Sequence, residues 1–348
     1  MKRIGSFIKE ILQKCLCRHA GDRFSGRESG RTQYAPGVHT RDGMQQIRHP
    51  VSNVPPSYLP PGREGDTGIR RNNVVEFSGL IQRFLKAVIY ILALLWGNFA
   101  TAEAVAIRLA YMGDTDNPAY LGAQQGLSEA NLQGKFLNQQ YELDAVSAAA
   151  ALTTDYTPYL AVVAAVDHDT YRKLLDKLPN VPVFNVNLED DDLRAACLPN
   201  ALHIVPSRQM KQDAVAQWHK KNPDAEVTAQ TWHSSYVKFA ARDLNKRFTK
   251  NYKKPMDDPA WAGWAAVKMT SDTVARENIT DPAKLLDYLK TSLLFDGQMG
   301  IEMNFRPTGQ LRQPLLLIDN GKIAGEAPVK GVANPTDLDS LGNVECSK

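Results

Sequence analysis

An almost uninterrupted apolar run, YLAVVAAV at Tyr159–Val166, sets strict limits on the fold of this chain. A run without polar alternation is typical of a β-strand that is buried on both faces. Strands of this kind belong to parallel sheets, whose crossover connections place helices over both faces. We therefore expect further strands along the chain, each separated from the next by a helix.

That alternation is present over residues 105–220. The expected strands are short apolar runs: Val105–Met112, Tyr159–Val166, Val181–Asn187 and Ala201–Pro206. The expected helices between and after them are Ala119–Gln133, Asp169–Leu178, a helix that opens with Glu189–Asp192, and Ser207–Lys220. Strands that alternate with helices predict an α/β fold built on a doubly wound, mostly parallel sheet.

The pattern changes after Glu226, where helices dominate. Two of them are expected to open at aspartate–proline pairs, Asp258-Pro259 and Asp281-Pro282, because an N-cap aspartate before a helical proline is a typical start. The expected elements are helices Ser234–Tyr252, Pro259–Glu277 and one through Leu289, then β-like pieces Gly300–Phe305 and Pro314–Asp319. The tail from Lys322 is expected to be rich in loops.

The formal charge of +3 over 348 residues combines two unlike parts. Residues 1–86 hold 15 Lys+Arg and 7 Asp+Glu, whereas residues 103–348 hold 26 basic and 31 acidic side chains. A globular domain that binds nucleic acid is normally basic. The acidic balance of the second part therefore argues against DNA or RNA as a partner.

The join between these parts has the pattern of a secretory signal. A basic flank precedes the uncharged run AVIYILALLWG (87–97), and an Ala-x-Ala site at 100–102 follows it. Eleven apolar residues form about 16 Å of helix, which is too short for a hydrocarbon core of ~30 Å. We interpret residues 79–102 as a signal peptide, cleaved before Glu103, that exports residues 103–348 to the periplasm. The alternative is an uncleaved membrane anchor that leaves the domain facing the periplasm.

Residues 1–78 precede this signal and cannot supply a folded core. Beyond residue 20 they are rich in Gly, Pro, Arg and Ser, with few periodic apolar residues. Met1–Ala20 has helical apolar spacing, so one interpretation is a segment that lies on an anionic membrane and carries lipid on its two cysteines. The other interpretation is that translation begins near residue 74 or 75, which makes the upstream part a mis-annotated extension.

Motifs of catalysis and metal binding are absent from the sequence of residues 103–348. It has no Gly-rich phosphate loop, no G-x-S-x-G, no H-E-x-x-H and no C-x-x-C. The acidic run Glu189–Asp192 could attract a hard cation, but it lacks the alternating oxygens and turn glycine of a Ca²⁺ loop. Carboxylates in a first helical turn complement the helix dipole instead. We therefore expect no enzymatic activity, no cofactor and no metal site.

His168 stands between two aspartates, Asp167 and Asp169, directly after the buried strand. In open α/β sheets, ligands bind at the edge that contains the carboxyl ends of the strands. A histidine in such a loop either forms a hydrogen bond with a ligand or acts as an acid and base. We favour the hydrogen bond.

Motifs spread over most of the chain from Ile107 to Cys346 resemble those of one family. They are Asp191-Asp192-Leu193-Arg194, Cys197, His203 to Met210, Asp213 to Gln217, Trp232-His233, Leu244 to Phe248, Met256, Ala260-Trp261-Ala262, Phe305-Arg306-Pro307, Gly309 to Pro314 and Asp337 to Gly342. Together they resemble the ABC-transporter substrate-binding proteins associated with PQQ-dependent alcohol dehydrogenase systems. That family is a branch of the leucine-binding-like, type I periplasmic binding proteins. The resemblance implies non-covalent recognition of a solute without turnover.

The chain departs from this family in one respect. Family members have two α/β lobes around a cleft, and their chain crosses to the second lobe and back. Here only residues 219–231 separate the helix that contains Met210 and Trp218 from Trp232-His233, so a segment on the order of a hundred residues is missing. We expect residues 103–348 to form one lobe with the return segments, whose open face dimerises or docks on a partner.

The family places its ligand groups on the loops after the strands of the first lobe. In this sequence those loops are 113–120, 167–170 and 187–190, at the carboxyl ends of the expected strands. The polar candidates on them are Asp114, Tyr120, Asp167, His168, Asn187 and Glu189. Cys197 and Cys346, the two cysteines of residues 103–348, also match family positions, and we expect a disulfide between them that ties the tail to the body.

Two functions follow as expectations. The first is an exported solute-binding protein linked to quinoprotein alcohol oxidation or uptake, with a small-molecule solute and an ABC permease as partners. The second is a single-lobe interaction protein that docks on a periplasmic dehydrogenase, a cytochrome, a transporter component or a second copy of itself.

The signal pattern predicts that the mature protein begins at Glu103 and resides in the periplasm, because cleavage follows the small residues Ala100 and Ala102. N-terminal sequencing of protein from fractionated cells measures this. An intact cytoplasmic chain that starts at Met1 would contradict it.

Overall fold

The computed structural model describes residues 83–90, 104–343 and 345–346. Residues 83–90 form a helix, while the rest of the expected signal peptide (79–102) and the expected extension (1–78) lie outside the described residues. Residues 104–346 belong to one compact unit. Within the described residues, no helix has both the length and the apolar character needed to cross a membrane.

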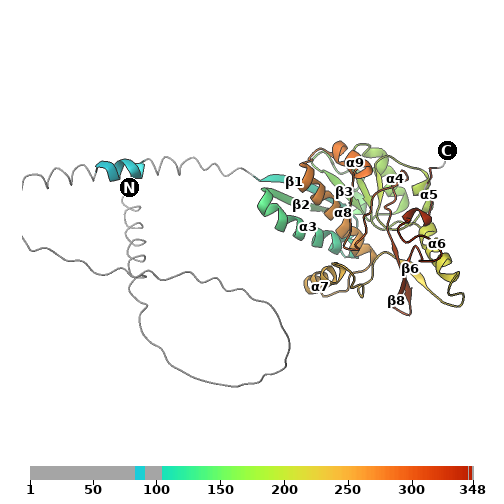
Figure 1. The fold of residues 1–348 in the computed structure, drawn as a ribbon. Helices are drawn as coiled ribbons and strands as arrows, with labels where there is room; N and C mark the ends of the chain where they lie inside the picture. The colour runs from blue at the N-terminus through green and yellow to red at the C-terminus, as the bar shows by residue number, and fades with distance from the viewer. Residues whose placement is uncertain (1–82, 91–103, 344, 347–348) are drawn as a thin grey trace, which may run out of the picture. The chain divides into compact units, whose positions relative to one another are not determined.

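Five parallel strands form the central sheet, in the order β2-β1-β3-β4-β5. They are β1 (Val105–Met112), β2 (Gln139–Val146), β3 (Ala161–Ala164), β4 (Val183–Asn185) and β5 (Ala201–His203). β1 has the bounds predicted from the sequence, and β3, β4 and β5 lie within the predicted strands. Because all the strands run in one direction (Figure 1), their carboxyl ends meet at a single edge.

Helices cover both faces of this sheet. α3 (Pro118–Leu137), α7 (Ala241–Tyr252), α8 (Asp258–Glu277) and α9 (Pro282–Thr291) contribute to the core on one face, and α4 (His168–Lys177) and α5 (Asp191–Ala195) contribute to the core on the other. Alternate residues of β1 show the division: Leu109 and Tyr111 face the first group, whereas Ala110 and Met112 face the second. The sheet is therefore doubly wound, as predicted.

α3 and α8 cross at glycines, where their backbones touch. A Cβ atom added at Gly122 of α3 would overlap the carbonyl oxygen of Ala260, and one added at Gly263 of α8 would overlap the carbonyl oxygen of Ala119. Glycine is therefore required on both helices for this approach. The contact holds α8, a late element of the chain, against the helix that follows the first strand.

A second, smaller sheet lies beside α6 (Arg208–His219; Figure 1). Its antiparallel strands are β6 (Thr228–Gln230), β7 (Leu315–Asp319) and β8 (Lys322–Ala327), in the order β6-β7-β8. Met210 and Ala214 of α6 share a core cluster with Leu315 and Leu317 of β7. The sequence predicted β7, but it predicted neither the second sheet nor the strand β8, whose residues are mostly only partly buried and lack an apolar run.

Several predicted helix starts differ from the structure. The helix expected to open with Glu189–Asp192 begins at Asp191, with Asp190 as its N-cap. The helix expected over Ser234–Tyr252 begins only at Ala241, because Phe239 has a left-handed backbone with φ of 50° that a helix does not accept. The N-cap of α8 is Asp257 rather than Asp258. The carboxylate of Asp257 accepts the N–H of Ala260 at 3.0 Å, which leaves Asp258 inside the first turn.

One further strand was not predicted, and one predicted strand is absent from the described residues. β2 was not expected, because this edge strand is only partly buried and its sequence QQYELDAV has no apolar run. The piece expected at Gly300–Phe305 forms isolated bridges instead of a strand. Met303 pairs with Phe295 and Phe305 pairs with Leu311, so the partner changes after two residues and no ladder develops. The remaining short helices are η2 (Ala148–Ala150) and η3 (Leu338–Ser340).

The predicted disulfide between Cys197 and Cys346 is present, with Cα atoms 5.6 Å apart. A second interaction holds the tail: the carboxylate of Asp339 accepts hydrogen bonds from Arg306 and Arg312, both at 2.8 Å. The C-terminal segment is thus fixed to the body just after α5.

Replacing Gly263 by alanine should lower the free energy of unfolding by about 3 kcal/mol or more, because backbone and not a flexible side chain fills the space. Urea unfolding followed by circular dichroism measures the change. Ser128→Ala, on an exposed position of α3, is the control and should shift stability by less than about 0.5 kcal/mol. Equal stability of the two variants would rule out the backbone contact.

Candidate functional site

The carboxyl edge of the five-stranded sheet holds all six residues predicted for the site. They follow β1, β3 and β4, which are neighbours in the sheet: four lie in the loops, whereas Tyr120 lies near the amino end of α3 and His168 is the first residue of α4. The backbones of the first two loops lie close together, since a Cβ atom added at Gly113 (φ of 136°) would stand 2.5 Å from the carbonyl oxygen of Ala165. The sheet order therefore gathers the predicted loops along one edge.

Asp167 closes the amino end of α4. Its carboxylate accepts the N–H of Thr170 at 3.0 Å and the hydroxyl of Thr170 at 2.7 Å. These two hydrogen bonds stabilise the charged form and lower the pKa of Asp167. The residue is exposed, but its main role in this structure is to cap the helix that carries His168.

His168 links two loops of the site. Its Nε2 atom lies 2.8 Å from Oδ2 of Asp192, and its Nδ1 atom lies 3.4 Å from Oδ1 of Asp169. The hydrogen bond with Asp192 is the main cause that raises the pKa of His168. The imidazole therefore joins the start of α4 to the first turn of α5. The pKa of His168 depends on this hydrogen bond with Asp192.

Asn187 and Glu189 join the loop after β4 to its two neighbours. The Nδ2 atom of Asn187 donates to the carbonyl oxygen of Val166 at 2.9 Å, in the loop after β3. The carboxylate of Glu189 accepts from Nζ of Lys211 on α6 at 2.7 Å. Polar side chains thus connect the loops after β3 and β4 to each other and to α6.

Lys211 extends the connection to the return segment. Its Nζ atom lies 4.0 Å from Oδ2 of Asp258, whose other oxygen, Oδ1, accepts the backbone N–H of Trp232. Burial raises the pKa of Asp258 to about 6, and the bonds from Trp232 and the charge of Lys211 oppose that rise. The first turn of α8 is therefore part of the same polar arrangement.

Asp114 and Tyr120 stand apart from the other four predicted residues. Within the described chain, no hydrogen bond or ion pair joins either side chain to Asp167, His168, Asn187 or Glu189. Asp114 is exposed, and its carbonyl oxygen accepts the N–H of Asn117 at 3.2 Å. The hydroxyl of Tyr120 accepts from Gln124 at 2.8 Å, and its ring centroid lies 5.0 Å from that of Tyr111.

Arg194, a residue to which the sequence assigned no role, organises the loops from inside. It is 2% exposed, and its guanidinium donates to four uncharged acceptors at 2.8–2.9 Å. The acceptors are the carbonyl oxygens of Leu188, Asp190 and Val205 and the side-chain oxygen of Gln310. Burial lowers the pKa of Arg194 to about 10. A single arginine that follows an acidic run gives no sequence signal of such burial.

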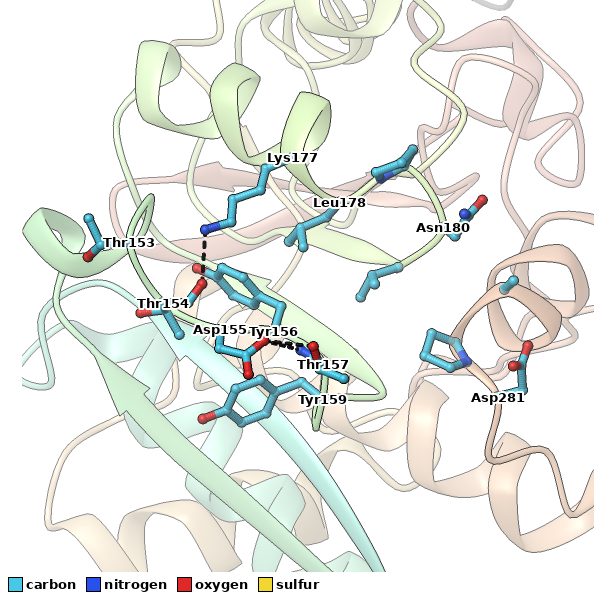
Figure 2. A pocket seen from close by; sticks show the side chains of 14 residues that line it. Thr153, Thr154, Asp155, Tyr156, Thr157, Tyr159, Lys177, Leu178, Asn180 and Asp281 are labelled. Carbon is cyan, nitrogen blue, oxygen red and sulfur yellow. Dashed lines mark hydrogen bonds between the residues drawn. The ribbon is translucent and has the colours of Figure 1, made fainter.

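A cavity of about 760 Å³ lies at the opposite edge of the sheet, before β3 and β4 (Figure 2). It is lined by residues 153–157, 159, 177–181 and 281–283. Its central charged groups are already engaged, since Nζ of Lys177 donates to the carbonyl oxygens of Leu152 and Thr154 and Asp155 accepts from Thr157. None of the six predicted residues lines it, so the carboxyl edge remains the candidate site.

Among residues 83–90, 104–343 and 345–346, no three His, Cys, Asp or Glu side chains are grouped so that they could hold a metal ion. In the acidic run, Glu189, Asp190 and Asp192 pair with Lys211, Arg208 and His168, and Asp191 accepts the backbone N–H of Gln209. The chemistry that this arrangement offers is hydrogen bonding and charge recognition.

Solved periplasmic binding proteins have a similar fold. A branched chain amino acid ABC transporter periplasmic ligand-binding protein from Burkholderia xenovorans matches with a TM-score of 0.55 at 14% identity, over 69% of this chain and 94% of that one. A leucine binding protein from Thermotoga maritima matches with a TM-score of 0.52 at 10% identity, over 63% and 98% of the two chains. The fold is similar to that of these periplasmic binding proteins.

A third similar structure holds a ligand. It is a branched-chain amino acid transporter substrate binding protein from Streptococcus pneumoniae in complex with isoleucine, with a TM-score of 0.53 and 10% identity over 64% of this chain and 99% of that one. No protein-family model and no curated protein matches this sequence. At 10–14% identity the likeness establishes the periplasmic-binding-protein fold, and the ligand is a separate question.

Asp192→Asn should lower the pKa of His168, because the carboxylate stabilises the imidazolium. A histidine titration by NMR measures it, with Asp176→Asn near the far end of α4 as the control. The raised pKa of His168 gives stability that is fully present below the pKa of the unfolded state and is lost as the pH rises through the folded-state pKa. The stability difference between wild type and Asp192→Asn should therefore shrink above that range. An unchanged pKa of His168 in Asp192→Asn would contradict the hydrogen bond between His168 and Asp192.

Proposed function

We propose that this chain is an exported, non-catalytic solute-binding protein of the ABC-transporter type, linked to PQQ-dependent alcohol oxidation. One observation carries the proposal: the polar loops of a periplasmic-binding-protein lobe converge at the carboxyl edge of its parallel sheet. Side-chain contacts of His168, Asn187 and Glu189 join the segments after β3 and β4 to each other and to α6. Open α/β sheets bind their ligands at this edge.

The same residues supply the groups for recognition. The imidazole of His168 is about one-third exposed, at 34%, so it can contact a solute while it stays bonded to Asp192. The carboxylate of Glu189 is 41% exposed and has a second oxygen beyond the one that meets Lys211. Asp114, just after β1, and Tyr120, near the start of α3, contribute from the other side of β3. Such contacts bind and orient a solute, and they involve no bond-breaking step.

The link to quinoprotein alcohol oxidation rests on the sequence motifs described above, such as Phe305-Arg306-Pro307 and Gly309 to Pro314. Two of these motif residues have clear structural tasks, since Arg306 holds the tail through Asp339 and Gln310 accepts from Arg194. The disulfide supports an oxidising compartment and thus the periplasm. An ABC permease is the partner that this role requires.

A second candidate function is docking on another protein. It is favoured by the exposure of Asp114, Asp167 and Asn187 at the edge that a second lobe would cover. The smaller sheet has only three short strands, which is far less than a full lobe. Without closure of a second lobe, a solute makes about half of its contacts, and its affinity falls toward the millimolar range. A dehydrogenase, a cytochrome, a transporter component or a second copy then becomes the natural occupant of the face.

Thermal-shift and calorimetric screening of the purified protein against alcohols, organic acids, metal ions and PQQ tests the proposal. We expect one class to bind and Asn187→Ala to weaken it roughly tenfold, because a hydrogen bond worth about 1.4 kcal/mol changes affinity tenfold. Asn180→Ala, an exposed asparagine at the opposite edge, is the matched control. Absence of solute binding together with a stable homodimer or a dehydrogenase complex would reject solute binding and support docking.

A further inference from the structure

A second cavity, of about 730 Å³, lies away from the carboxyl edge, between the smaller sheet and two loops. The end of α6, the end of β8 and residues around 236–239 and 299–301 line it. None of the six candidate residues of the carboxyl edge contributes to its wall. Its volume falls within the range of pockets that hold small organic ligands.

The wall of this cavity is mainly apolar. Tyr236, Phe239, Met299, Ile301 and Pro328 form much of it. Tyr236 and Met299 are buried, at 3% and 2% exposure, whereas Phe239 is 66% exposed. The cavity therefore has a fixed apolar floor and one aromatic ring that stands open to solvent.

Phe239 is held in this exposed position at a conformational cost. Its φ of 50° is left-handed, which is a rare and strained backbone for a bulky side chain. Its ring lies directly against Gly300, where an added Cβ atom would stand 2.5 Å from the ring carbons. A strained backbone and a glycine thus cooperate to place an aromatic ring at the cavity, which is typical of a binding site rather than of a surface loop.

The charged side chains that line the cavity have a positive excess. Lys221, Lys330 and Glu326 line it. Glu326 is neutralised by Lys238, whose Nζ atom lies 2.7 Å from the carboxylate and which is outside the lining. Lys221 donates to the carbonyl oxygen of Lys330, an uncharged acceptor, so its charge is not compensated there. The two lining lysines leave the cavity with a net positive character.

We propose that this cavity binds an amphipathic organic anion, with an aromatic or branched apolar body and a carboxylate. The apolar body packs between Phe239 and the floor of Tyr236 and Met299, and the carboxylate faces Lys221 and Lys330. None of the six carboxyl-edge candidates lines this cavity, so the site is distinct from the one proposed for the solute.

Calorimetry on the full-length protein with 4-phenylbutyrate and its uncharged analogue 4-phenylbutanol tests the apolar wall. We expect both to bind, and the anion more tightly. Phe239→Ala should weaken both roughly tenfold through lost apolar contact. Val237→Ala removes a similarly exposed apolar side chain, 62% exposed, from outside the lining and should change neither. Absence of binding of both probes up to ~10 mM, or equal losses in the two variants, would overturn the proposal.

Lysine variants test the charge. Lys221→Met and Lys330→Met together should remove the preference for phenylbutyrate and leave phenylbutanol binding unchanged, whereas Lys322→Met, on an exposed position of β8, should preserve the preference. A preference that survives the double variant would overturn the assignment of the carboxylate. Asn187→Ala should not affect either probe, which keeps this result distinct from solute binding at the carboxyl edge.

Discussion

The buried guanidinium of Arg194 is the interaction on which the carboxyl edge depends. It donates to carbonyl oxygens on the loops after β4 and β5 and to the side chain of Gln310 on the return segment. No carboxylate of the described chain forms an ion pair with it; carbonyl oxygens bond it directly, and the charges of Glu189, Asp190 and Asp191 also favour the guanidinium. Loss of this side chain would leave several buried acceptors unpaired, each at about 1–3 kcal/mol. The two loops and the return segment are therefore held in one geometry by one residue.

The fold could be predicted where local chemistry and packing agree. The apolar run at β3 required a parallel sheet, β1 was predicted with its bounds, and Asp281 caps α9 as expected. β2 was not predicted, because an edge strand needs no apolar run. The start of α7 was predicted too early, because composition does not encode the left-handed backbone of Phe239. The start of α8 shifted by one residue because two adjacent aspartates, Asp257 and Asp258, compete for the cap.

The sequence also predicted only part of the candidate site. Parallel strands oblige the loops after β1, β3 and β4 to meet at one edge, so the placement of His168, Asn187 and Glu189 followed from strand order. Their partners did not, because Asp192, Val166 and Lys211 are chosen by loop conformation and by helix packing across 21 to 24 residues of sequence. Arg194 and Asp258 were missed because burial of a charged side chain has no signature in a single sequence.

The glycine crossing of α3 and α8 has a consequence for the order in which the molecule is made. The buried face of α3 is completed by α8, whose glycine lies more than a hundred residues further along the chain. Closing so long a loop is slow, and the early strands have no complete core until α8 has been synthesised. A nascent chain of this design therefore stays open through most of its translation, and it reaches its compact form only after nearly all of it is available.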